Sequence, residues 1–81
     1  MSEFPADLPW RDFKQILKKL GYELGKEGPG AARTYNNQHR DPESVTFHEP
    51  HGKHGLKKGT LREYVRKLKL EREEFLELLN S

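Results

Sequence analysis

The residues best suited to chemistry in this sequence lie between residues 46 and 61, in the segment TFHEPHGKHGLKKGTL. Imidazoles, amines and flexible backbone positions crowd together there: His48, His51, His54, Lys53, Lys57, Lys58, Gly52, Gly55 and Gly59. An imidazole has an unperturbed pKa of about 6.5, so it can give or take a proton near neutral pH. Lysines add a positive field that attracts phosphate. The combination predicts a surface that contacts the phosphates of RNA.

Metal-free RNA cleavage needs a base for the 2′-hydroxyl, an acid for the departing 5′-oxygen and cations for the phosphate. His48 is the candidate catalytic residue, because we expect it to project from the uncovered face of a strand; the alternative is an ordinary exposed histidine. His51 lies between Pro50 and Gly52, where it is predicted to lock a turn through a backbone hydrogen bond, with an RNA contact as the alternative. His54 is expected to contact phosphate or solvent.

No metal ion or other cofactor is expected at these histidines. Glu49 is the one carboxylate among them, and on a strand it points to the opposite face from His48. The chain has no cysteine, so no thiolate ligand or disulfide is available either. The chemistry must therefore come from the protein side chains.

Lys57 and Lys58 come immediately before the predicted start of a helix, which Thr60 and Glu63 open with a capping-box pattern. The unpaired N–H groups and the dipole of a helix N-terminus favour an anion at this point. Lys53 adds positive charge in the preceding turn. We therefore predict phosphate contacts here, although lysines beside a glycine turn also occur on surfaces that bind nothing.

Arg33, on a predicted strand, can add a bidentate phosphate contact. The bases of A-form RNA are poorly accessible from its deep groove, so a small domain is expected to read phosphate spacing and 2′-hydroxyls. The shape of the RNA, more than its base sequence, would be recognised.

A short series of elements is predicted to position these residues. Apolar residues at helical spacing indicate two amphipathic helices and a short last one, and alternation with turn residues indicates three strands. The elements are a helix from Trp10 to a stop at Gly21, strands at 22–24, 31–36 and 44–48, a flexible glycine turn at 25–30, a helix from Leu61 and a last turn or two around Phe75. Residues 1–8 are expected to form a loosely ordered N-terminal segment, a loose lead to the first helix.

This order predicts a single α+β domain of 81 residues. It is an α-β-β-β-α-(α) two-layer sandwich, in which a three-stranded antiparallel sheet carries the helices on one face and leaves the other face open. The third strand turns Val45 and Phe47 inward and His48 outward. The second strand adds either Arg33 or Thr34 to the open face, depending on the register.

The composition favours function at the surface. Charged residues make up 35% of the chain and apolar ones 32%, so the aromatic residues are needed for a thin core. The formal net charge is +2, but the charge is uneven, with a basic stretch at 51–70 followed by an acidic tail. The sequence lacks a secretory signal and an apolar run of the ~20 residues that a membrane helix needs. A cytosolic location is expected.

The C-terminal part, EPHGKHGLKKGTLREYVRKLKLEREEFLELL, resembles the second half of the HicA toxins. Members of that family typically carry a proline-histidine turn, a basic stretch, Gly-Thr-Leu opening a helix, and a final Glu-Phe-Leu helix. The first half fits in outline, through an amphipathic helix that ends in Leu20-Gly21-Tyr22. The resemblance implies a fold like that of double-stranded-RNA-binding domains, metal-independent endoribonuclease activity on messenger RNA, and a HicB-like antitoxin as partner.

The sequence departs from the family at the position that matters most for catalysis. The catalytic histidine of the family follows a Gly-Ser pair at the start of the second strand, whereas this chain has Gly30-Ala31-Ala32. Ala32 has no proton to give or take. Three alternatives account for it: a divergent branch that uses another residue such as His48, a relative that only binds, or a deliberate inactivation.

The leading hypothesis is an RNA-binding HicA-like toxin domain whose catalysis is undetermined. The residues expected to contact RNA are Arg33, His51, Lys53, Lys57, Lys58 and Thr60. The alternatives are a non-catalytic double-stranded-RNA-binding module and a protein-interaction domain with a basic face. We expect the antitoxin to cover the same surface as RNA, because Arg33, His48, Lys57 and Lys58 are predicted to lie on one face.

Overall fold

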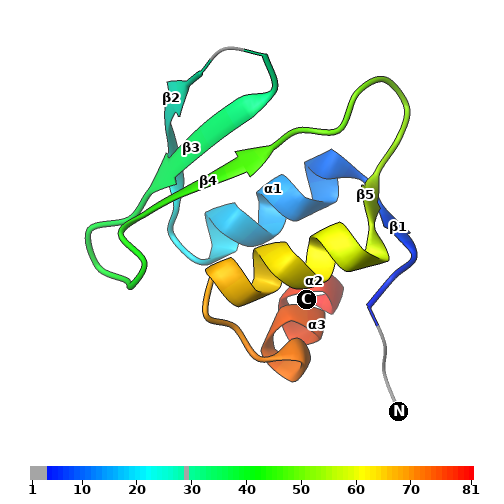
Figure 1. The fold of residues 1–81 in the computed structure, drawn as a ribbon. Helices are drawn as coiled ribbons and strands as arrows, with labels where there is room; N and C mark the ends of the chain where they lie inside the picture. The colour runs from blue at the N-terminus through cyan, green and yellow to red at the C-terminus, as the bar shows by residue number, and fades with distance from the viewer. Residues whose placement is uncertain (1–3, 29) are drawn as a thin grey trace.

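The computed structural model, which describes residues 4–28 and 30–81, confirms the α+β fold (Figure 1). Helices α1 and α2 lie side by side against one face of a three-stranded sheet, and α3 lies on the far side of these helices from the sheet. The elements are β1 (Asp7–Leu8), α1 (Trp10–Lys19), β2 (Glu23–Glu27), β3 (Ala32–Asn36), β4 (Ser44–His48), β5 (Leu56–Lys57), α2 (Lys58–Lys67) and α3 (Arg72–Asn80). Among the described residues, no helix is long and apolar enough to cross a membrane.

Helix α1 forms as its apolar spacing predicts. Its buried side chains recur every three or four residues and join the core: Trp10, Phe13, Ile16 and Leu17. The helix stops at Gly21, which has a φ of 95°, a conformation that glycine adopts without strain. The Tyr22 N–H then donates to the Leu17 carbonyl at 2.9 Å and closes the helix end.

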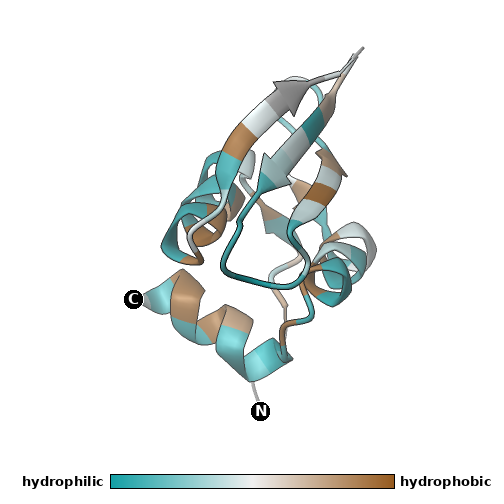
Figure 2. Cartoon of the chain, turned by 90° about the vertical axis from the view of Figure 1, so that its left-hand side faces the viewer, coloured by the Kyte–Doolittle hydropathy of each residue, from teal (hydrophilic) through white to brown (hydrophobic). Residues whose placement is uncertain are grey.

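The sheet has the order β2-β3-β4 with antiparallel neighbours. Val45 and Phe47 are buried, whereas Thr46 and His48 are exposed, as the alternation predicts. Hydrophobic and hydrophilic residues alternate along the strands in Figure 2. Strand β2 is longer than expected, because it continues past Gly25 through a register shift, and this places part of the predicted flexible turn in the sheet.

An aromatic cluster ties the sheet to the helices. The Phe13 and Phe47 rings meet edge to face with centroids 5.0 Å apart, and Phe47 lies 4.7 Å from the Tyr64 ring. Phe13, Phe47 and Tyr64 come from α1, β4 and α2, and all three are buried. This cluster confirms that the aromatic side chains form the core, and it holds β4 in a fixed place.

The N-terminal residues are less loose than expected. Strand β1 pairs antiparallel with β5, Leu8 is buried, and the Asp7 carboxylate accepts a hydrogen bond from the Gly55 N–H at 3.0 Å. Phe4 packs edge to face on Phe75. The prediction of a loose lead is therefore wrong for residues 4–8, and residues 1–3 lie outside the described residues.

Helix α2 begins earlier than the capping-box pattern predicts. Its N-cap is Lys57, whose extended backbone belongs to β5, and no side chain caps the helix. Thr60 lies inside the first turn, so the predicted cap by Thr60 and Glu63 is wrong. Pairing with β1 keeps the chain extended up to Lys57 and sets the helix start. A capping box is present instead on α3, between Glu71 and Glu74.

Candidate functional site

Ala32 and His48 are cross-strand partners on the open face of the sheet. The next pair along the same face is Thr34 with Thr46, whose hydroxyls share a hydrogen bond of 2.9 Å. A Cβ atom built on Gly28 would lie 3.3 Å from the Ala32 Cβ, so Gly28 is the neighbour of Ala32 on its other side. Ala32 therefore lies between a residue without a side chain and an exposed histidine.

The backbone of His48 is fixed to helix α2. Its N–H donates to the Tyr64 hydroxyl at 3.0 Å, and the same hydroxyl donates to the His48 carbonyl at 3.1 Å. Tyr64 is buried, whereas the His48 side chain is exposed. The imidazole thus projects into solvent from a rigid anchor, a suitable placement for contact with a large ligand.

The register corrects the expectation that Arg33 shares this face. Arg33 pairs with buried Phe47, so it points to the helix side at the end of the sheet, and Thr34 takes the place on the open face. Its guanidinium lies 3.3 Å from the Glu49 carboxylate and donates to the carbonyls of Gly30 and Ala32 at 3.1 and 2.9 Å. Arg33 therefore organises the ends of β3 and β4.

The turn after β4 is closed by the backbone of His51. The His51 carbonyl accepts from the His54 N–H at 3.3 Å, and Gly52 has a φ of 63°. The His51 imidazole is exposed and makes no hydrogen bond within the described part of the chain, so its side chain does not lock the turn as predicted. Lys53 and His54 are exposed at the tip.

The remaining residues predicted to contact RNA, Lys57, Lys58 and Thr60, lie on two different surfaces. Lys57 is exposed at the end of β5 and Thr60 is exposed in the first turn of α2. Lys58 is half-buried and lines a groove between α2 and the start of α3, together with Arg62 and Arg66. Sequence reasoning missed this groove, although Lys58, Arg62 and Arg66 recur at the four-residue spacing that places side chains on one helix face.

Among the described side chains of β3 and β4, the open face offers one imidazole, three hydroxyls and one amide: His48, Thr34, Thr46, Ser44 and Asn36. Within residues 4–28 and 30–81, no three histidine, cysteine or acidic side chains come together as a group that could hold a metal ion. The face is polar, uncovered by any described helix, and bordered at one end by the turn that carries Lys53. Such a surface suits a large polar ligand.

Comparison with models of known protein families gives a match for this chain. The family model described as the HicA toxin of bacterial toxin-antitoxin matches residues 10–70, from the start of α1 to the residues that follow α2. Searches of curated proteins and of solved structures found no match. The matched segment contains the three-stranded sheet, both helices that cover it, and the Ala32–His48 pair. The chain belongs to the HicA toxin family of bacterial toxin-antitoxin systems.

Proposed function

We propose that this domain binds RNA over the open sheet face and the turn that joins β4 to β5. The observation that carries the proposal is the Ala32–His48 pair on an uncovered polar face, in a chain that belongs to a toxin family. Lys53, in the turn that follows β4, and Lys57, at the end of β5, are exposed and would supply cations for phosphates. The backbone and 2′-hydroxyls of the RNA, which every sequence offers, are the expected contacts.

Cleavage of messenger RNA by this chain is proposed to be slow or absent. Transfer of the 2′-hydroxyl proton and protonation of the 5′-oxygen require a base and an acid. On the open face described here, His48 is the one imidazole, and the facing position holds Ala32. The domain thus retains a surface for RNA while it lacks half of the proton-transfer machinery, which favours a binding role over a cleaving one.

Membership in a toxin-antitoxin family implies an antitoxin partner. We propose a HicB-like protein that covers the open face, so that RNA and the antitoxin exclude one another. An acidic antitoxin surface would also associate faster with the basic turn, an advantage that salt reduces. Both partners would meet the domain in the cytosol.

Loss of the exposed lysines Lys53 and Lys57 tests the proposal. The double variant Lys53→Ala/Lys57→Ala should bind RNA more weakly, whatever the RNA sequence, with a shallower dependence of affinity on salt. Each phosphate contact removed should lower the slope of log K against log salt by roughly 0.7 to 0.9. Fluorescence anisotropy with a labelled RNA over a salt series measures both quantities. Lys58 is left unchanged, since it lines the groove between α2 and α3.

The matched control is Lys14→Ala/Lys18→Ala, which removes the same charge from exposed positions of α1. It should leave the salt slope close to that of the parent chain. Equal slopes and affinities in the parent and in the folded Lys53→Ala/Lys57→Ala variant would show that RNA does not contact this turn.

A further inference from the structure

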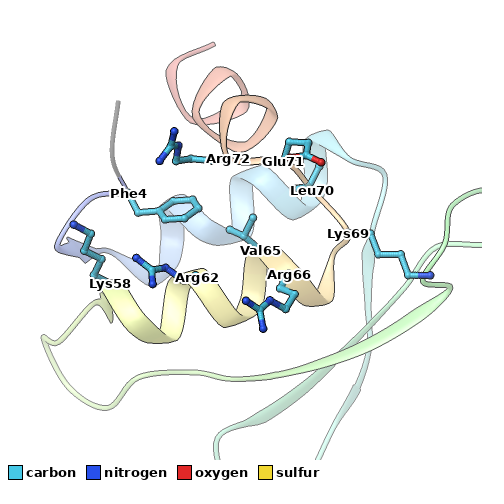
Figure 3. A pocket seen from close by; sticks show the side chains of 9 residues that line it. All are labelled: Phe4, Lys58, Arg62, Val65, Arg66, Lys69, Leu70, Glu71 and Arg72. Carbon is cyan, nitrogen blue, oxygen red and sulfur yellow. The ribbon is translucent and has the colours of Figure 1, made fainter. Parts of the chain in front are cut away.

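A cationic groove runs between α2 and the first turn of α3 (Figure 3). Five basic side chains line it: Lys58, Arg62, Arg66, Lys69 and Arg72. No strand of the three-stranded sheet contributes to it. The groove is therefore a surface separate from the open face.

Two of these cations have no partner within residues 4–28 and 30–81. Lys69 pairs with Asp41, and Arg72 lies 3.9 Å from the Glu73 carboxylate. Arg62 and Arg66, which are exposed and one helical turn apart, have no ion pair and no side-chain hydrogen bond among the described residues. Like charges at this spacing repel each other. A bound carboxylate would offset that repulsion and satisfy the two-pronged guanidinium geometry.

The groove also has an apolar floor, made by Phe4, Val65 and Leu70. Phe4 is half-buried and its ring is held 5.6 Å from the ring of Phe75; Val65 is buried and Leu70 is half-buried. Figure 3 shows the Phe4 ring over the side of α2 that carries Val65. A phosphodiester backbone offers no apolar group for such a floor. An acidic amphipathic protein segment offers both apolar side chains and carboxylates.

We propose that this groove docks an acidic, amphipathic segment of the antitoxin. Its apolar side chains lie on Phe4 and Leu70, and its carboxylates pair with Arg62 and Arg66. The inference rests on the existence of a protein partner, which family membership implies, and it is independent of RNA binding to the open face. Phe4 and Arg72 lie outside the segment that the family model matches, and the other residues that line the groove lie within it or directly after it.

Charge reversal of the unpaired arginines tests the docking site. Arg62→Glu/Arg66→Glu should weaken binding of the antitoxin by about tenfold or more, measured by isothermal titration calorimetry, because two attractive contacts become repulsive. The matched control, Lys14→Glu/Lys18→Glu, changes the net charge equally at the same spacing on the exposed side of α1. It should change the affinity by less than about threefold, through the long-range field alone.

A parallel RNA titration separates the possible outcomes. A larger loss of RNA affinity than of antitoxin affinity in the arginine variant would overturn the proposal and make the groove a nucleic-acid surface. Equal losses of antitoxin affinity in the arginine variant and its control, or no loss in either, would also overturn it. Failure of Lys53→Ala/Lys57→Ala to affect RNA binding would instead count against the open-face proposal and leave the groove untouched.

A second measurement covers the case in which charge reversal disturbs folding. The unaltered chain, labelled with ¹⁵N, is titrated with a synthetic peptide that has leucine every third or fourth position and glutamate elsewhere. Amide shifts of Val65, Arg66 and Leu70 should move with increasing peptide, and they should move less in Arg62→Gln/Arg66→Gln. Shifts confined to Thr34, Thr46 and His48 would place the peptide on the open sheet face and contradict the docking site.

Discussion

Ala32 occupies the position that faces His48 on the proposed RNA surface. It faces His48 across β3 and β4, and residues directly opposite in an antiparallel pair have Cβ atoms about 4.5 to 5.5 Å apart. A histidine at position 32 would therefore bring two imidazoles to one phosphate, one as base and one as acid. Ala32→His should raise RNA cleavage by ~10² to 10⁴ over the parent chain. A denaturing gel in the presence of a chelator, with analysis for 2′,3′-cyclic phosphate ends, measures it.

Thr34→His is the control for this gain, because it places an imidazole on the same face beside Thr46 instead of His48. It should cleave no faster than the parent chain. If the parent already cleaves quickly and Ala32→His adds nothing, another group supplies the missing proton transfer, and His48→Ala then shows whether that group is His48.

Tyr22 makes the domain sensitive to alkaline conditions. Burial raises the pKa of its phenol above the ordinary value of 10.0, and its hydroxyl donates to the Pro42 carbonyl at 2.7 Å. The folded state therefore holds the proton more tightly than the unfolded state. Its contribution to stability is complete below pH 10 and is lost as the pH rises through 10 toward the raised pKa.

Thermal melts of the parent and of Tyr22→Phe between neutral pH and pH 11 measure this loss. The variant should be less stable near neutral pH by ~1 kcal/mol, because it lacks the hydrogen bond. Its melting temperature should then fall less steeply in the alkaline range. If the melting temperatures of the two proteins fell in parallel with rising pH, the alkaline loss of stability would come from groups other than Tyr22.

Among the elements, those with a long repeating pattern could be predicted from the sequence. Helix α1 and strand β4 each carry enough apolar residues at one period to define a buried face. Strands β1 and β5 have two residues each, so they contain no period, and they form because each is the other's partner. The start of α2 depends on that pairing, and the local capping pattern at Thr60 therefore misled the prediction.

Gly55 and Gly59, which flank β5, provide opposite tests of this pairing. A Cβ atom on Gly55 would lie 2.6 Å from the Leu8 carbonyl oxygen, whereas one on Gly59 would meet nothing within 4 Å. Gly55→Ala should destabilise the fold by about 1 to 3 kcal/mol through this overlap. Gly59→Ala, in the first turn of α2, should stabilise it by about 0.5 to 1 kcal/mol through helix propensity.

Chemical unfolding of both variants measures the two free energies. Since both substitutions add the same methyl group within a few residues of each other, each serves as the control for the other. A Gly55→Ala variant as stable as Gly59→Ala would mean that β1 is not held against Gly55.

The domain as a whole separates residues that the sequence predicts on one surface. Arg33, His48 and Lys58 were expected on one surface, but they lie at the end of the sheet, on the open face and in the groove beside α2. The order of the elements was sufficient to predict the α+β sandwich. The face of His48 could be predicted from the alternation in β4, whereas the places of Arg33 and Lys58 could not. A shift of one residue in the register of β3 turns Arg33 to the opposite face, and the start of α2, which depends on the pairing of β1 with β5, decides where Lys58 lies.

The position of α3 has a consequence for how the groove responds to its occupant. One wall of the groove belongs to α2, and Arg72 belongs to α3, which is held by the contact of Phe75 with Phe4 and by the Lys19 ammonium bound to the Leu78 carbonyl at 2.7 Å. If α3 detaches, the groove loses that side. A segment that touches both sides binds only the closed arrangement, so by mass action a bound partner lowers the population of molecules in which the C-terminal helix is detached. The partner would thereby protect the end of the toxin chain from proteolysis as it occupies the groove.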